Sequence, residues 1–340
     1  MLRALIAVFE PFVLALVGTM LLASFLPARG MAAPVFESLT TAGIVLLFFL
    51  HGAKLSREAI LGGARNWRLH LAVLATTFVL FPLLGLAFVS LPILEGPMAA
   101  GLLFLTLLPS TVQSSIAFTA IARGNVAAAV CSASFSNLLG IIVTPALVAI
   151  VMSRPGASAS ISIDSVQAIA LELLLPFLLG HALRPWLGSF VSRHKKLVSI
   201  VDRGSILLVV YTAFSAAVVG GLWQRLSGES LILLLAVCCA LLAAILLLTR
   251  ATGRLLGFNR EDSIVLLFCG SKKSLATGVP IAGLLFPPAQ VGAVILPLMI
   301  FHQIQLIACA VIARRYAEKA EKEESLVSRT DGTMVRPVRR

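Results

Sequence analysis

Long apolar runs follow one another along most of the chain, and short stretches rich in proline, glycine and charge separate them. Each run is close to the roughly 20 residues that an α-helix needs to cross a bilayer. The alternation of polar and apolar positions that marks an outer-membrane barrel is absent from the sequence. We therefore predict an all-α, polytopic membrane protein with ten transmembrane helices. They lie at about 11–27, 35–52, 67–89, 98–122, 126–151, 165–185, 205–223, 231–249, 262–284 and 289–313.

Polar residues interrupt two of these runs near the middle of the membrane. The fourth run contains Pro109 within the polar stretch 108–115, and the ninth contains Gly270 within 269–274. Proline lacks an amide hydrogen and glycine loosens a helix, so each break frees backbone groups that cannot stay unpaired in hydrocarbon. A single break is equally typical of a kink that serine and threonine hydroxyls satisfy. Two breaks in corresponding positions instead indicate a transport site.

The positions of the breaks also divide the chain. Each falls in the fourth run of a set of five, and an odd number of spans gives the two sets opposite orientations in the membrane. We predict a first five-helix repeat at 9–153 and an inverted second repeat at 163–315, with broken helices 4 and 9. After about residue 314 the sequence becomes rich in both signs of charge, which predicts a solvated cytoplasmic tail at 316–340.

The composition excludes most other classes of protein. Of 340 residues, 59% are hydrophobic and 12% are charged, and the mean hydropathy is +1.01. A water-facing domain carries about 25% charged residues. The five cysteines all lie in apolar runs, where thiols behave as small hydrophobic groups, so no structural disulfide is expected. No P-loop, G-x-S-x-G turn or metal-ligand spacing is present in the sequence, and we expect neither an enzyme nor a bound cofactor.

The net charge of +12 reflects topology. Most of the 27 lysines and arginines fall in the loops on one side of a ten-span arrangement, together with both ends of the chain. By the positive-inside rule both termini are cytoplasmic, in a plasma (inner) membrane. The basic residues therefore indicate an orientation in the bilayer, and no nucleic-acid partner is expected.

Lys272 and Lys273 are the most unusual residues of the ninth run. A lysine at mid-membrane costs at least about 2.5 kcal/mol, so two adjacent lysines indicate a function. Neighbouring helical residues point in different directions, so one lysine can face a polar cavity while the other pairs with a carboxylate or reaches backbone carbonyls. Glu172, in the sixth run, is the candidate counter-ion; a carboxylic acid kept neutral by burial is the alternative.

Hydroxyl and amide side chains surround the two breaks and complete the candidate site. With the lysines and Glu172, the predicted substrate- or ion-binding residues are Thr111, Gln113, Ser114, Ser115, Ser136, Asn137, Ser271 and Ser274. Small residues of this kind also pack helices together, so the serines have a purely structural alternative. His181 and His302 are predicted to be hydrogen-bonded packing residues.

Several motifs resemble one transporter family. They are LPSTVQSSIAFT at 108–119, ARGNVA at 122–127, NLLG at 137–140, TP at 144–145, FFLHG at 48–52, VDR at 201–203 and GSKKSLA at 270–276. On these motifs the chain resembles the sodium/bile acid symporter superfamily over roughly residues 5–315, most closely its SBF-like branch. The resemblance implies two inverted five-helix repeats in which spans 1, 2, 6 and 7 form a panel and the other six a core, with helices 4 and 9 crossing at their unwound centres.

The resemblance also implies where a coupling ion would bind. In sodium-coupled members, polar residues of the fourth-span break, hydroxyls of the fifth span, and a glutamate and a glutamine of the ninth-span break hold sodium. Ser114 and Ser115 match the first group. The glutamate position falls at about Phe268 and the glutamine position at Lys272, so the acidic ligand is missing. Coupling to Na⁺ or to H⁺ is left open.

We expect a secondary transporter that moves an organic, anionic and amphipathic solute by alternating access. Fixed positive charge near the end of a half-helix favours a carboxylate or a sulfate, which is the reason for expecting an anion. The alternative is a non-transporting membrane regulator, because relatives in the same branch are associated with calcium homeostasis. The sequence identifies neither the solute nor the oligomeric state.

Overall fold

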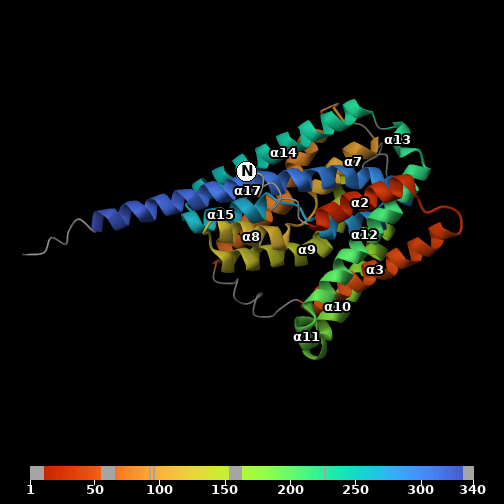
Figure 1. Ribbon diagram of the computed structural model, residues 1–340, viewed down its shortest axis with the longest axis horizontal. Coiled ribbons are helices and arrows are strands. Elements are labelled where there is room, and N and C mark those ends of the chain that lie inside the picture. Colours follow the sequence, from red (N-terminus) through yellow and green to blue (C-terminus); the bar gives the residue numbers. More distant parts are fainter. Residues whose placement is uncertain are drawn as a thin grey trace, which may run out of the picture.

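The described part of the computed structural model comprises residues 11–54, 66–91, 93–94, 96–152, 163–225 and 227–331, and its regular elements are all helices (Figure 1). The first half contains α2 (Pro11–Phe25), α3 (Ala32–Lys54), α5 (Trp67–Ala75), the π-helix η2 (Thr76–Leu80), α6 (Phe81–Val89), α7 (Gly96–Thr106), α8 (Val112–Ile121) and α9 (Val126–Met152). The second contains α10 (Ile163–Ala182), α11 (Arg184–Arg193), α12 (Lys195–Val219), α13 (Leu222–Arg225), α14 (Gly228–Leu255), α15 (Arg260–Gly270), α16 (Leu275–Leu285) and α17 (Pro288–Asp331).

Seven helical stretches of the described residues are long and apolar enough to cross a membrane. They are Ala32–Lys54, Trp67–Val89, Val126–Met152, Lys195–Val219, Gly228–Leu255, Arg260–Leu285 and Pro288–Lys322. Shorter apolar helices occur at Leu14–Phe25, Gly96–Thr106, Val112–Ile121 and Leu173–Ala182. Every predicted apolar run coincides with a helix or with a pair of half-helices, so the prediction of an all-α membrane protein is confirmed.

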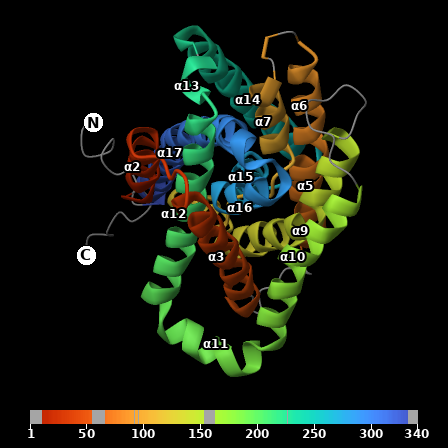
Figure 2. The same cartoon turned by 90° about the vertical axis from the view of Figure 1, so that its right-hand side faces the viewer.

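Helices α2, α3, α10 and α12 form one group, in which α3 packs against α10 and α12. With α11, they form a frame along one side of the molecule (Figure 2). Glycines allow α3 and α10 to approach closely: a Cβ on Gly52 would lie 2.0 Å from the Phe177 carbonyl oxygen, and a Cβ on Gly180 would lie 1.9 Å from that of Phe49. Because neither glycine has a side chain, the two backbones touch at both positions.

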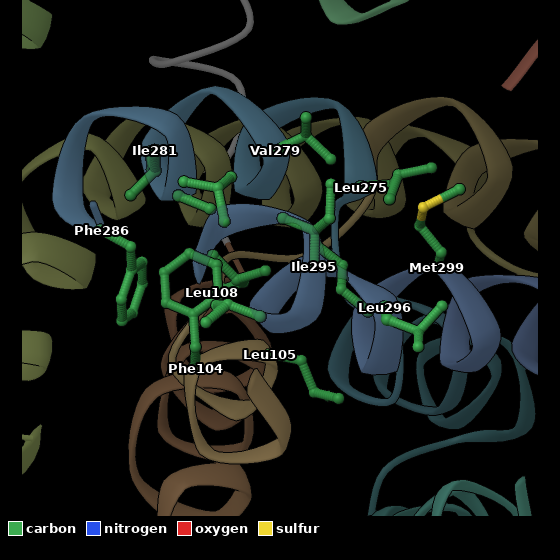
Figure 3. Close-up of a cluster of buried hydrophobic side chains, with 14 of the residues drawn as sticks. Phe104, Leu105, Leu108, Leu275, Val279, Ile281, Phe286, Ile295, Leu296 and Met299 are labelled. Carbon is green, nitrogen blue, oxygen red and sulfur yellow. The ribbon is translucent and has the colours of Figure 1, made fainter. Parts of the chain in front are cut away.

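The other helices surround the α15–α16 pair. In the most apolar window of Arg260–Leu285, 94% of the residues are buried inside the protein, against 33% for Gly228–Leu255. The pair is therefore enclosed by protein, and it is not a lipid-facing span. Phe104 and Leu108 from the α7 region pack against Leu275, Val279 and Phe286 of the α16 region (Figure 3). The Phe104 and Phe286 rings lie edge to face, 5.3 Å apart, which is a favourable aromatic geometry.

The predicted cytoplasmic tail begins inside a helix. Helix α17 runs without interruption from Pro288 to Asp331 and so carries the chain well beyond the apolar run that ends near residue 313. Residues 332–340 of the predicted tail lie outside the described part. Residues 316–331 of the predicted tail are therefore helical.

Candidate functional site

The two predicted helix breaks are present and contact each other. Helix α7 ends at Thr106 and α8 begins at Val112, while α15 ends at Gly270 and α16 begins at Leu275. The Ser274 amide donates to the Pro109 carbonyl at 2.9 Å, and the Thr111 hydroxyl donates to the Lys273 carbonyl at 2.9 Å. Backbone groups that the breaks free are therefore used to join the two breaks, as low-dielectric surroundings require.

The first break is shorter than the polar stretch that predicted it. Gln113, Ser114 and Ser115 lie in the first turn and a half of α8, because the helix begins at Val112. Thr111 is the N-cap of α8, with φ −73° and ψ 130°; its side chain makes no capping hydrogen bond, and its hydroxyl donates to the Lys273 carbonyl. In contrast, Ser274 caps α16 by accepting a hydrogen bond from the Thr277 amide, which is the usual role of a serine at this position.

Helix α9 supports both breaks from one side. The Ser136 hydroxyl accepts from the Ser110 amide at 3.0 Å, and the Thr144 hydroxyl donates to the Leu107 carbonyl at 2.9 Å. The Asn137 side-chain oxygen accepts from the Thr277 hydroxyl at 2.8 Å, so α9 also contacts α16. Ser136 and Asn137 are therefore scaffold contacts of the breaks, and the sequence placed both of them at the site.

The two lysines have opposite surroundings although they are adjacent and both fully buried. The Lys273 Nζ atom donates to three backbone carbonyls, those of Thr77 at 2.9 Å, Thr106 at 2.7 Å and Leu108 at 2.7 Å. This agrees with the expectation that one lysine reaches carbonyls at a break. The prediction did not include Thr77, which lies in η2 of the third apolar run.

The Lys272 Nζ atom makes no hydrogen bond to any described residue. It lies 4.0 Å from the centre of the Phe118 ring and 5.4 Å from that of Phe268, so its contacts are with aromatic faces. A lysine ammonium is attracted to such faces, more strongly when water is excluded. The side chain expected to face a polar cavity is thus fully buried, and Phe118 is one of the residues that cover it.

The structure adds two residues of α17 to the site. Gln305 is fully buried and binds the backbone of Lys273 twice, accepting from its amide at 2.9 Å and donating to its carbonyl at 3.0 Å. Its side-chain nitrogen also lies 2.8 Å from Nδ1 of His302. We expected His302 to be a hydrogen-bonded packing residue, which this contact bears out, but we did not consider Gln305. The signal in the sequence was two polar residues spaced one helical turn apart in an otherwise apolar run.

Three cavities meet at Gln113. A vestibule of about 850 Å³ is bounded by Lys54, Gln113, His181, Arg184, Lys195 and Asp202, among others. A middle cavity of about 150 Å³ is lined by Gln113 together with His51, Asn137, Asp202, Arg203 and Ser274. A deep cavity of about 320 Å³ is lined by Gln113 with Phe12, Thr111, Ser114, Phe118 and His302. The three cavities share lining residues and so lie next to one another, from the vestibule to the helix breaks.

Charged groups of both signs line the vestibule. Lys54, at the end of α3, forms an ion pair with Asp202 of α12, and their side chains are 35% and 17% exposed. Arg184 and Lys195 are the other cationic side chains of its wall. Among the described residues of its wall there are one acid and three bases, a positive excess that favours the entry of anions.

The remaining predicted site residues differ in their surroundings. The Ser115 hydroxyl donates to the Phe268 carbonyl at 3.0 Å and that of Ser271 donates to the Leu267 carbonyl, so both hydroxyls are used within the scaffold. Ser114 is one of the residues that line the deep cavity, and its hydroxyl is buried without a hydrogen-bond partner among the described residues. Glu172 lies on α10, but its side chain is outside the described part, so its predicted pairing with a lysine stays a prediction.

Comparison with known proteins identifies the class. Residues 10–318 match the SBF-like CPA transporter family, and the chain belongs to this family. It is 56% identical to Putative symporter YfeH of Escherichia coli K12 over 320 residues, covering 94% of this chain and 96% of that protein. It is 27% identical to Sodium/bile acid cotransporter 7 of Rattus norvegicus over 276 residues, covering 79% and 80% of the two chains. The predicted resemblance is confirmed, and the chain is a multi-pass membrane protein of a transporter family.

Proposed function

We propose that this protein is a secondary transporter that carries an organic, anionic and amphipathic solute across the plasma (inner) membrane by alternating access. The observation that carries the proposal is the series of cavities joined at Gln113, which connects the basic vestibule with the paired helix breaks. A ligand site between broken helices near mid-membrane is the usual arrangement of secondary transporters. This structure is then a state open toward the vestibule.

Ten membrane spans in two inverted repeats explain the helix order. Besides the seven long stretches, α2 and α10 supply spans 1 and 6, and α7 with α8 supplies the broken span 4. The breaks then occupy the fourth span of each half, as an inverted repeat requires. Lys54, Arg184 and Lys195 lie on the vestibule. Because basic residues favour the cytoplasmic side of a membrane protein, we place the vestibule and both termini in the cytoplasm.

The electrostatics of the site support an anionic solute. The described wall of the vestibule has a positive excess. The first turn of α8 borders the deep cavity, and the side chain of its N-cap, Thr111, makes no hydrogen bond to the amides of that turn. The N-terminal end of a helix carries partial positive charge and favours a carboxylate or sulfate. In the same wall, Phe12, Phe118 and Leu306 offer apolar surface to the rest of an amphipathic molecule.

A thermal-shift experiment tests the solute class. Purified protein in detergent is heated with a bile-acid anion, a steroid sulfate, or a quaternary ammonium compound of similar size. We expect the anions to raise the Tm and the cation to leave it unchanged. Gln113→Ala removes the side chain shared by all three cavities. The anion concentration needed for the same rise in Tm should then increase at least about tenfold, which corresponds to a loss of about 1.4 kcal/mol in binding free energy.

The matched control is Gln224→Ala, which changes an exposed glutamine of α13 and should retain the full response. A shift caused equally by the cation, or an anion response that Gln113→Ala leaves unchanged, would contradict this assignment of the cavity. The same variants can be compared for uptake into proteoliposomes, where Gln113→Ala should reduce anion uptake and Gln224→Ala should not.

A further inference from the structure

The Lys273 ammonium lies in a site that the backbone has built for a cation. Three carbonyl oxygens surround Nζ at 2.7 to 2.9 Å, and the Phe81 ring centre lies 4.2 Å away. A neutral amine has two N–H donors, whereas an ammonium has three. Three carbonyls within hydrogen-bond distance therefore match the charged form, and the aromatic face adds a fourth favourable contact.

Two of these carbonyls have lost their usual helical partners. In η2 the Phe81 amide bonds to the Thr76 carbonyl, and the next residue, Pro82, has no amide hydrogen, so the Thr77 carbonyl has no helical donor there. At the end of α7, Pro109 likewise cannot donate to the Thr106 carbonyl, and the Ser110 amide is taken by Ser136. Without Lys273, both carbonyls would be buried and unsatisfied, which is costly in a protein interior.

The position of the site adds an electrostatic argument. Thr106 is the last residue of α7, and Leu108 lies in the break that follows, so their carbonyls belong to the partially negative end of a half-helix. A positive charge at this end is stabilising, and a carbonyl cluster is the type of site in which proteins bind monovalent cations. Carbonyl groups from η2, from the end of α7 and from the break after α7 thus surround the Nζ atom of Lys273, which lies in the break of the ninth run.

We infer that Lys273 is a built-in cation: its ammonium permanently fills a carbonyl site between η2, the end of α7 and the break before α16. Deleting the side chain exposes this site to a small cation from solution. The inference concerns the resting structure and does not depend on transport, although, if the proposed transport function holds, it explains how the breaks stay joined without a sodium ion.

The test is the thermal stability of the purified protein in equal concentrations of choline, sodium, potassium and propylammonium chloride. Lys273→Ala removes three methylenes and the ammonium, and propylammonium supplies the same atoms. We expect the variant to unfold at least about 5 °C lower than the wild type in choline chloride. Propylammonium, and to a smaller extent Na⁺ or K⁺, should recover part of this loss, while the wild-type Tm should not distinguish the four salts.

Lys272 supplies the matched control because it is adjacent, equally buried and without a hydrogen bond to the described residues. Lys272→Ala should show no specific response to propylammonium over choline. The inference is overturned if the Tm of Lys273→Ala is the same in choline as in sodium, potassium and propylammonium chloride. It is also overturned if Na⁺ raises the Tm of the wild type as much as that of the variant.

A second pair of variants applies if the alanine variant does not fold. Lys273→Met and Lys272→Met keep most of the side-chain volume and remove only the charged amine. We expect Lys273→Met to lower the Tm, because three carbonyls lose their donor, and Lys272→Met to leave it unchanged or raise it. Equal effects of the two methionine variants would also overturn the inference. These measurements need no solute, so their outcome is separate from that of the transport assay.

Discussion

The Ser274 amide donates a 2.9 Å hydrogen bond to the Pro109 carbonyl, so the breaks of the two discontinuous helices are joined directly through their backbones. The Thr111 hydroxyl adds a second connection, to the Lys273 carbonyl. Backbone hydrogen bonds in a dry interior are strong and costly to break. The two breaks are therefore held to each other by hydrogen bonds inside the protein.

Gly140 of α9 is required for the first break to fit. A Cβ at this position would lie 2.6 Å from the Pro109 ring, whose backbone is constrained by the pyrrolidine. Gly140→Ala should destabilise the protein by about 1–3 kcal/mol, as overpacking of a close interior does. The measurement is thermal unfolding in detergent. Gly204→Ala is the control, because a Cβ there has open space around it; an equal loss in both variants would contradict the packing argument.

The close approach of α3 and α10 depends on Gly52 and Gly180 together. Each added Cβ would clash with a carbonyl of the opposite helix, so either alanine substitution should push the helices apart and cost about 1–3 kcal/mol. Once the helices have separated, the second substitution should cost less. A double-mutant cycle of unfolding free energies should therefore give a combined loss smaller than the sum of the single losses. Additive losses would show that the two contacts are independent.

Lys272→Met should affect thermal stability and anion uptake differently. Its amine is buried without a hydrogen bond to the described residues, so replacing it with methionine removes a desolvated polar group and should leave the Tm unchanged or higher. If its charge acts on the solute from behind Phe118, anion uptake should nevertheless fall at least about tenfold. The two measurements are thermal unfolding and proteoliposome uptake of the same preparation. Unchanged uptake would exclude Lys272 from solute recognition.

The architecture could be predicted from the sequence to a large extent because the bilayer imposes simple rules. Apolar length located the helices, and Pro109 and Gly270, together with the polar residues beside them, marked the two breaks. The meeting of the breaks was expected only through the family resemblance. No rule of periodicity gives the contact between Ser274 and Pro109, which are far apart in the chain and are joined by backbone atoms.

The side-chain contacts of the site were less predictable. The sequence could not tell which of the two lysines would bind carbonyls, because that depends on a third helix, where η2 and Pro82 free the Thr77 carbonyl. Gln305 was missed for a similar reason: its partner is the backbone of Lys273, and backbone partners leave no pattern in a sequence. The polar residues of the site could be recognised from their side-chain types in the sequence, but their hydrogen-bond partners became known only from the structure.

The most direct test of the central claim is the uptake of a radiolabelled bile-acid-like anion into proteoliposomes with an inward sodium gradient, an inward proton gradient or no gradient. A carrier whose helix breaks hold the fixed charge of Lys273 should accumulate or exchange the anion equally well when choline replaces sodium, and Lys273→Met should reduce this uptake. Absence of uptake of any organic anion under all three conditions would contradict the transport function. Uptake that requires sodium in the wild type would contradict the account of the lysine as a built-in cation.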